Sequence, residues 1–397
     1  MVHQHYAEQW RQLDMVYHGI KDFPKQQNDV LRSRLRVPWA WQQIETIKPR
    51  IMDPDPVFEY LPVEKGDIDN SQSWNKLVRQ QLNADRFNMK QSSFVEDGLV
   101  KGFAVSKAIW LSQKQKMRVR PKQNMLQMAM SFGKRPEPEE KEVIVVNRPT
   151  LLYVDPYDFM WDPAATNDQD WRYVFHRSWL TMAELTQREE MGLYKNVKKL
   201  EGEGNTGADA TEERSIKESP EEAKAKRTGK YAVWERWSRD GTVMVMCGDT
   251  VLRDDPNPYF HGDIPFAVFR SQPNPRSMVG ISEIEKIEHL QEAIWTRDNQ
   301  RIDAVSLALN TVLIIDPTIP NARNIQFQPG QKIYATAGQK VEQLKIDPMQ
   351  IPGFEETASY IGSMQQMTGA NAVMYGASAE QAGIDNSTAT GVSIMQE

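Results

Sequence analysis

Few side chains of this sequence are spaced for catalysis or metal binding. Asp155, Asp158 and Asp162 share one short segment, but the proline and aromatic residues between them are typical of turns. Only two of the six histidines, His3 and His5, are close in sequence, and a single cysteine cannot supply the ligands of a zinc site. The phosphate-binding pattern G-x-x-x-x-G-K-[ST] is absent. We therefore expect no catalytic residue, no metal and no cofactor, and a protein that is not an enzyme.

Basic residues suggest a second kind of chemistry, the binding of nucleic acid. Cations occupy every second position from Lys114 to Lys122 and would lie on one face of a strand. No aromatic residue is interleaved with them, so a stacking platform is not indicated and a solvated strand face is favoured. The formal net charge of −6 also argues against a wholly basic binding surface, because binding to DNA depends on neutralising phosphates.

Length and composition limit the class of protein. A chain of 397 residues exceeds the size at which one hydrophobic core stops growing, so two or more packed regions are expected. No run approaches the roughly 18 to 20 apolar residues that cross a bilayer, and the first residues do not have the pattern of a signal peptide. We expect a protein made in the cytoplasm, without a membrane segment.

The first hundred residues are expected to be mainly helical. Apolar residues at helical spacing predict two helices between residues 5 and 50, with Leu31 and Leu35 on the second. Prolines at positions 49, 54 and 56 are expected to end that helix, and 57–63 alternates like a short strand. The next helix, 73–99, would be capped by Asp69 or Ser71.

Alternating apolar and polar residues predict a series of strands further along the chain. The expected strands cover 103–110, 142–148, 151–154, 171–179, 231–237, 243–247, 250–253 and 266–270. Residues 123–141 would form a hairpin insertion at the surface. Thr181 and Glu184 have the spacing of a capping box that opens a short helix. Residues 195–230 are almost free of large apolar side chains and are expected to form a flexible loop.

The C-terminal third begins with a long predicted helix, about 282–310. An apolar stripe runs along this helix, formed by Ile284, Ile287, Leu290, Ile294, Ile302, Val305 and Leu309. The other faces are charged, so the helix should pack in a bundle or against copies of itself. A β-containing lobe, 311–351, separates it from a second helix, 352–368, and the two helices are expected to be antiparallel.

Two C-terminal segments resemble parts of a known family. Residues 280–303, GISEIEKIEHLQEAIWTRDNQRID, resemble the first stem helix of tailed-bacteriophage portal proteins. The sequence MTGAN at 367–371, followed by Gly376 and by TAT at 388–390, resembles the end of the second stem helix and the tunnel loop of that family. The order of helix, lobe, helix, loop and helix also matches stem, clip, stem, tunnel loop and tunnel helix. The N-terminal two thirds resembles the wing in layout more than in motifs.

The resemblance implies an α+β fold that has a wing domain of mixed helices and strands, two long antiparallel stem helices and a small α/β clip. Its parts would be a wing at 1–278 with the flexible loop 195–230, stem helices at 279–310 and 352–370, a clip at 311–351, a tunnel loop at 371–390 and the start of a tunnel helix at 391–397. Because the family's chains usually continue past this point, we expect the chain to be cut short at Glu397.

The resemblance also implies a function and a set of partners. The chain would form a homo-oligomeric ring, generally a dodecamer, at one vertex of the capsid, through which double-stranded DNA is packaged and ejected. Its partners would be the terminase large subunit, a head–tail adaptor, and the major capsid and scaffolding proteins. The insertion at 123–141, whose first half is rich in methionine, would contact a neighbouring subunit or a capsid protein. It would be made in a bacterial host and reside in the virion, with no membrane partner.

Three groups of candidate site residues follow from the resemblance. Tunnel-loop residues expected to contact DNA are Asn371, Tyr375, Gly376, Gly383, Asn386 and Thr388. Stem residues expected to pair between subunits are Glu285, Glu288, Arg297 and Arg301, and clip residues expected to dock partners are Arg323, Lys332, Tyr334 and Lys340. Solvated surface charges for the stem group and an ordinary linker for the loop remain alternative interpretations.

Two other functions remain open from the sequence. One is another virion structural protein, such as a capsid or adaptor subunit, although a helix–lobe–helix arrangement after a large mixed domain is unusual there. The other is a metal-dependent enzyme that processes nucleic acid, using the aspartates of 155–162, although no ligand spacing supports it. A nuclease assay with Mg²⁺ and the symmetry of the particle would separate these alternatives.

Overall fold

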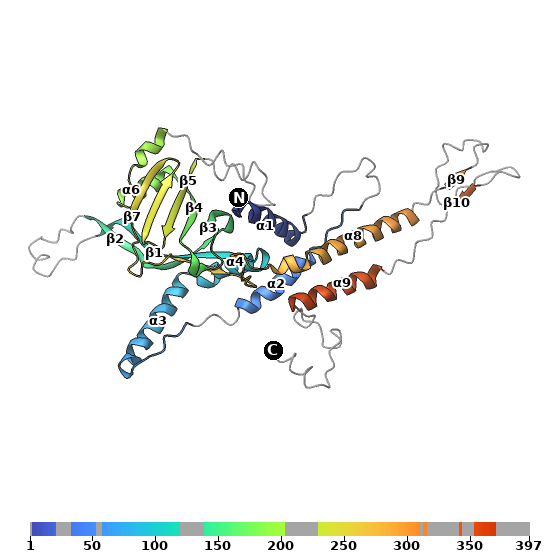
Figure 1. Ribbon diagram of the computed structural model, residues 1–397, viewed down its shortest axis with the longest axis horizontal. Coiled ribbons are helices and arrows are strands. Elements are labelled where there is room, and N and C mark those ends of the chain that lie inside the picture. The colour runs from blue at the N-terminus through green and yellow to red at the C-terminus, as the bar shows by residue number, and fades with distance from the viewer. Residues whose placement is uncertain are drawn as a thin grey trace, which may run out of the picture. The chain divides into compact units, whose positions relative to one another are not determined.

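The computed structural model describes residues 2–20, 33–52, 58–119, 139–202, 229–309, 313–315, 341–343 and 353–370 (Figure 1). The chain divides into two compact units. The first contains residues 1–14 and 44–283, and the second contains residues 15–43 and 284–397. The predicted wing range, 1–278, thus includes residues 15–43, which group with the second unit. Wing, stem and clip stay predictions.

Four helices cover the N-terminal part of the described chain: α1 (Val2–His18), α2 (Trp39–Met52), α3 (Ile68–Ala84) and α4 (Phe87–Val100). The prediction of one helix over 73–99 is wrong, because the chain breaks between α3 and α4, where Arg86 has a left-handed φ of 53°. The predicted cap at Asp69 or Ser71 is also wrong. Both residues lie inside α3, which begins at Ile68 after the short 3-10 turn η2 (Lys65–Asp67).

Proline positions explain two further differences from the expected helices. The predicted helix through Leu35 is wrong, because residues 33–38 are not helical; Pro38 disfavours helical backbone at the residue before it, and α2 starts directly after it. Pro49 lies inside α2, which continues to Met52. The strand expected at 57–63 does not form either, since residues 58–62 have no regular structure.

The first sheet of unit 1 has three strands in the order β2-β1-β8. Strands β1 (Ala104–Val119) and β2 (Glu139–Val154) form a long antiparallel hairpin, and β8 (Phe266–Phe269) pairs antiparallel with the start of β1. These strands confirm the predictions at 103–110, 142–148, 151–154 and 266–270. The expected insertion lies almost entirely in 120–138, outside the described residues.

The second sheet has five antiparallel strands in chain order. They are β3 (Phe159–Trp161), β4 (Tyr173–Thr181), β5 (Lys230–Ser238), β6 (Thr242–Cys247) and β7 (Thr250–Pro256). The predicted meander is confirmed, and so is the capping box. Thr181 Oγ1 accepts from Glu184 N, and the Glu184 carboxylate accepts from Thr181 N, at the start of α6 (Met182–Glu190). Most of the expected loop 195–230 lies outside the described residues; within its first part, Val197–Gly202 forms a 3-10 helix.

An aromatic core joins α1 to both sheets of unit 1. Trp10 of α1 stacks on Phe103 with ring centroids 5.8 Å apart, and Phe103 contacts Trp161 of β3 at 4.9 Å. Phe159 in turn contacts Phe266 of β8 at 5.1 Å. These rings are almost fully buried, and large buried aromatic side chains contribute strongly to core stability.

Unit 2 contains the two predicted C-terminal helices. They are α8 (Glu283–Leu309) and α9 (Gly353–Thr368), which run alongside each other in opposite directions (Figure 1). Between them, β9 (Leu313–Ile315) and β10 (Val341–Gln343) form an antiparallel pair. The mixture of helices and antiparallel sheet confirms the α+β class. In the described part of the chain, no helix combines the length and hydrophobicity needed to cross a bilayer.

Candidate functional site

The four predicted stem residues all lie on α8, and contacts of Arg297 and Arg301 within the chain can be described. Arg297 Nε is 3.1 Å from a Glu356 carboxylate oxygen on α9. Arg301 lies 3.6 Å from Asp298, whose carboxylate also accepts a hydrogen bond of 3.4 Å from Thr357 Oγ1 of α9. Partly exposed ion pairs of this kind contribute up to about 1 kcal/mol each. The Arg297–Glu356 pair and the Asp298–Thr357 hydrogen bond connect α8 with α9. Pairing of Glu285, Glu288, Arg297 and Arg301 between subunits stays a prediction.

A second set of α8 side chains, the amide brace (Gln291, Trp295 and Asn299), binds the backbone of residues 35–40. The Gln291 side-chain amide accepts from Ala40 N at 2.8 Å and donates to Val37 O at 2.9 Å. Trp295 Nε1 donates to the same carbonyl at 2.9 Å. Asn299 accepts from Leu35 N at 2.7 Å and donates to Leu35 O at 3.0 Å.

The amide brace is almost fully buried, and it was not among the site residues expected from the sequence. Its spacing of four residues is the signal that could have revealed it, since residues four apart share one helix face. Buried amide groups need hydrogen-bond partners, and residues 35–40 supply them. The brace therefore explains why a segment that is far away in sequence groups with α8.

The predicted clip residues (Arg323, Lys332, Tyr334 and Lys340) and tunnel-loop residues (Asn371, Tyr375, Gly376, Gly383, Asn386 and Thr388) lie outside the described residues. The same holds for the expected tunnel-helix start at 391–397. The backbone of the predicted basic strand is described up to Val119 within β1, but the side chains from Lys114 onward are not among the described ones.

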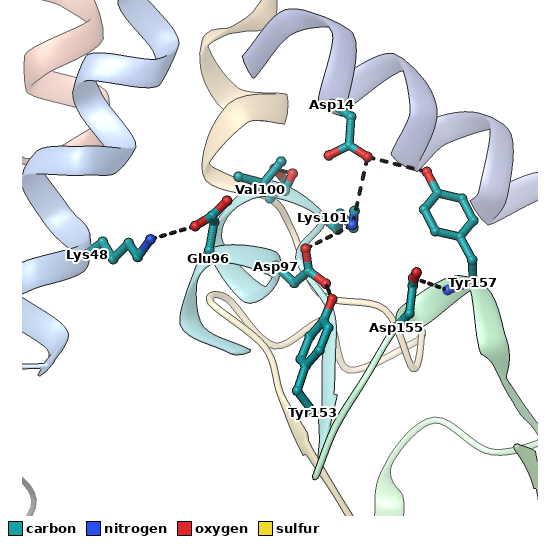
Figure 2. Close-up of polar contacts among 10 residues, drawn as sticks. Asp14, Lys48, Glu96, Asp97, Val100, Lys101, Tyr153, Asp155 and Tyr157 are labelled. Carbon is teal, nitrogen blue, oxygen red and sulfur yellow. Dashed lines mark hydrogen bonds and ion pairs between the residues drawn. The ribbon is translucent and has the colours of Figure 1, made fainter. Parts of the chain in front are cut away.

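Unit 1 contains a partly buried charge cluster that the sequence did not reveal. It consists of Asp14, Asp97, Lys101, Tyr153, Asp155 and Tyr157 (Figure 2). Lys101 Nζ lies 2.8 Å from Asp97 on the same helix turn and 3.8 Å from Asp14 of α1. Tyr153 of β2 donates to Asp97, and Tyr157 donates to Asp14 at 3.5 Å. Asp155 accepts from Tyr157 N at 3.0 Å.

Burial sets the electrostatics of this cluster. It raises the pKa of Asp14 to about 6, although Lys101 lowers it, and Asp97 and Asp155 raise it further. Burial also raises the pKa of Asp155. Burial alone would lower the pKa of Lys101, but the three carboxylates keep it above its usual range. A single lysine faces three carboxylates in this cluster. Asp14 therefore binds a proton at a higher pH than an exposed aspartate does.

The cluster joins several elements of unit 1. Its members come from α1, α4, the end of β2 and the turn η3 (Pro156–Asp158). Among the described side chains, no group of three or more His, Cys, Asp or Glu residues is placed to hold a metal ion. Two aspartates of 155–162 show the predicted turn chemistry: Asp155 caps η3, and Asp162 accepts from Ala164 N at 3.1 Å. Asp162 also binds Arg172, which lowers the pKa of Asp162 to about 2. Asp158 instead forms an ion pair of 2.8 Å with Arg177 of β4.

A second buried ion pair connects the two sheets of unit 1. Lys107 of β1 contacts the carboxylate of Glu235 on β5, and His176 Nδ1 of β4 lies 3.8 Å from the same carboxylate. Lys107 Nζ also lies 5.2 Å from the Trp237 ring. Burial alone would raise the pKa of Glu235, but Lys107 and His176 hold it well below its usual range. Removing one partner of such a pair would leave an uncompensated buried charge.

The described clusters hold elements of unit 1 together. The chain matches the family model described as phage SU10 portal protein over residues 2–397 and therefore belongs to that family. The expected resemblance to portal proteins is confirmed, and with it a place in the virion of a bacteriophage, in the head–tail connector that serves DNA packaging. Portal proteins are structural subunits, in agreement with the expectation of a protein that is not an enzyme.

Proposed function

We propose that copies of this chain assemble into a ring of about a dozen subunits around a channel for double-stranded DNA at one capsid vertex. The match to a portal family over residues 2–397 is the observation that carries this proposal. The antiparallel pair α8 and α9, with β9 and β10 between them, supports the assignment of 279–310 and 352–370 as stem helices and 311–351 as the clip. Residues 1–278 would form most of the wing.

In this proposal the protein acts by mechanical means. The clip, with Arg323, Lys332, Tyr334 and Lys340, offers the docking edge for the terminase large subunit during packaging and for a head–tail adaptor afterwards. The tunnel loop, 371–390, contacts the DNA that moves through the channel. Major capsid and scaffolding proteins surround the ring during assembly, which takes place in the cytoplasm of the bacterial host. The net charge of −6 suits a conduit that must not hold phosphates tightly.

The first experiment is negative-stain electron microscopy of the purified chain, with light scattering to obtain its mass. We expect rings with a central hole and the mass of about a dozen subunits. A nuclease assay with Mg²⁺ is expected to show no activity above a heat-treated sample. A homogeneous monomer or dimer at micromolar concentration would contradict the proposed ring.

A further inference from the structure

Helix α3 presents large apolar side chains to solvent. Its 17 residues include only one that is buried, Ser71. Trp74 is 55% exposed, and Leu61 and Val63, in the segment that leads into the helix, are 78% and 94% exposed. We name one exposed set the α3 apolar face; it consists of Tyr60, Leu61, Val63, Trp74 and Leu77. Figure 1 shows α3 projecting away from the sheets of unit 1.

Side-chain contacts hold the leading segment and α3 together as one surface. Asn75 accepts a hydrogen bond of 2.6 Å from Tyr60 N and donates one of 3.4 Å to Tyr60 O. The rings of Tyr60 and Trp74 lie 6.4 Å apart. Phe58, two residues earlier, contacts Phe87 and lines an apolar pocket of about 410 Å³ in the same unit. The apolar surface therefore extends from the pocket along α3.

Such a surface needs a cover in the working state of the protein. A helix of this length is only marginally stable in water without burial of an apolar face. Contiguous exposed apolar patches on soluble proteins mark interaction sites or cause aggregation. DNA does not fit the end of this surface, because residues 58–69 contain four carboxylates, Glu59, Glu64, Asp67 and Asp69, against one lysine.

We propose that the α3 apolar face packs against a second copy of this chain, as one side of the contact between neighbouring subunits. The inference rests on the proposed ring, in which every subunit has a neighbour from assembly onward. A partner that arrives later would leave the face exposed on every free ring. Interfaces that form permanently are also more apolar than transient ones. A closed ring uses heterologous contacts, so α3 meets a different surface of the neighbour rather than another α3.

The test compares two double variants of the full chain. Trp74→Glu with Leu77→Glu places two charges on the α3 apolar face, at positions already exposed to solvent. Gln72→Glu with Asn83→Glu places the same two charges at exposed positions on the polar side of the helix, by the helical period of 3.6 residues. Because buried aromatic residues dominate interface energies, we expect the first variant to lower the ring fraction at a fixed subunit concentration by at least about tenfold. The second variant should assemble like the unchanged chain.

A second pair of measurements keeps the test independent of folding in α3. Leu61→Glu with Val63→Glu changes residues that lie outside the helix, and it should also reduce assembly while the far-UV circular dichroism spectrum stays the same. Amide hydrogen exchange of 68–84 should be slower in rings of the unchanged chain than in the dissociated variants. Rings of normal abundance from both apolar-face variants, with equal exchange in ring and subunit, would overturn the inference and leave the ring proposal standing. Absence of rings from the unchanged chain would overturn both.

Discussion

At the scale of single residues, the partly buried charge cluster shows how one lysine can organise several elements. Lys101 is positioned by Asp97, four residues earlier on α4, and reaches Asp14 on α1. Both carboxylates accept a further hydrogen bond, from Tyr153 and Tyr157 respectively. Burial is the main cause of the raised pKa of Asp14, and the neighbouring Asp97 and Asp155 raise it further although Lys101 lowers it.

The Asp14→Asn variant tests this arrangement. The folded pKa of about 6 lies above the usual value of 3.8, so the folded state binds more protons than the unfolded state between those values. Asp14 therefore lowers stability as the pH rises through that window, and the loss is complete above it. We expect Asp14→Asn to be more stable than the unchanged chain at pH 8 by about 1 to 3 kcal/mol, with little difference near pH 4.

Urea unfolding at the two pH values measures this difference. Asp249→Asn, at an exposed position in the turn between β6 and β7, is the matched control and should change stability equally little at both. A lower stability of Asp14→Asn at pH 8 would mean that the attraction to Lys101 outweighs the cost of burial.

Part of this chemistry could be predicted from the sequence. The turn roles of Asp155 and Asp162 followed from the proline and aromatic neighbours, whereas the ion pair of Asp158 with Arg177 did not. The pair Asp97 and Lys101 has the spacing of neighbours on a helix. The approach of Asp14 could not be predicted, because it depends on how α1 packs against residues more than eighty positions away in the sequence.

At the scale of elements, the break between α3 and α4 has a tertiary cause. No glycine or proline interrupts residues 73–97, so the pattern alone favoured one helix. The Asp85 carboxylate, however, accepts from Thr150 Oγ1 at 2.8 Å and from Leu151 N at 3.1 Å on β2, and it pairs with Lys90 at 2.7 Å. These contacts hold the pKa of Asp85 below its usual value, although burial alone would raise it. Contacts to a distant strand override local helix propensity here.

The turn between α4 and β1 yields an element-scale prediction. Gly102 has a φ of +69°, and an added Cβ would lie 2.5 Å from the carbonyl oxygen of Gly280. Gly192 has a similar φ of +74° with no atom within 4 Å of such a Cβ. Gly192→Ala should cost about 1 kcal/mol through backbone strain alone. Gly102→Ala should cost about 1 to 3 kcal/mol more, because a backbone atom must move.

Thermal and urea unfolding of the two alanine variants, side by side, separate strain from close approach. Equal losses of stability would show that the contact between residues 102 and 280 relaxes freely and does not fix the start of β1.

The inter-sheet ion pair gives a second prediction at this scale. Lys107→Met keeps most of the volume of the aliphatic side chain but leaves Glu235 buried without its ammonium partner. The free energy of unfolding should therefore fall by about 3 to 5 kcal/mol at pH 7. The double change Lys107→Met with Glu235→Gln removes both charges and should recover a large part of the loss. Urea unfolding measures both variants. If Lys107→Met alone were as stable as the unchanged chain, water or His176 would have to compensate the negative charge of Glu235.

At the scale of the whole molecule, the order of segments was the most informative feature of the sequence. The long helix at 282–310, the strand-containing excursion and the helix at 352–368 appear as α8, β9, β10 and α9. The match over residues 2–397 confirms the family that this order indicated. The grouping of residues 15–43 with unit 2 could not be predicted, because Gln291 and Asn299 were not recognised as partners of a backbone segment.

The proposed channel leads to a prediction about charge. The predicted tunnel loop contains only two charged residues, Glu380 and Asp385. Changing both to lysine would place two cations per subunit near the DNA, so the ring should bind double-stranded DNA more tightly, with a steeper dependence of log K on log salt concentration. Glu190→Lys with Asp249→Lys makes the same change at exposed positions of unit 1 and should have a smaller effect.

Fluorescence anisotropy of labelled DNA at several salt concentrations measures both variants against the unchanged ring. An identical salt dependence for the two lysine variants would argue against a loop that lies in the DNA path.

The amide brace also has a consequence for how related sequences can vary. Gln291, Trp295 and Asn299 form hydrogen bonds with the peptide groups of residues 35–40. Selection acting through these bonds constrains the three α8 residues and the non-helical path before Pro38, while it leaves the side chains at positions 35 and 37 free to change. In diverging relatives we therefore expect the 33–38 segment to drift in sequence while its path along α8 stays the same.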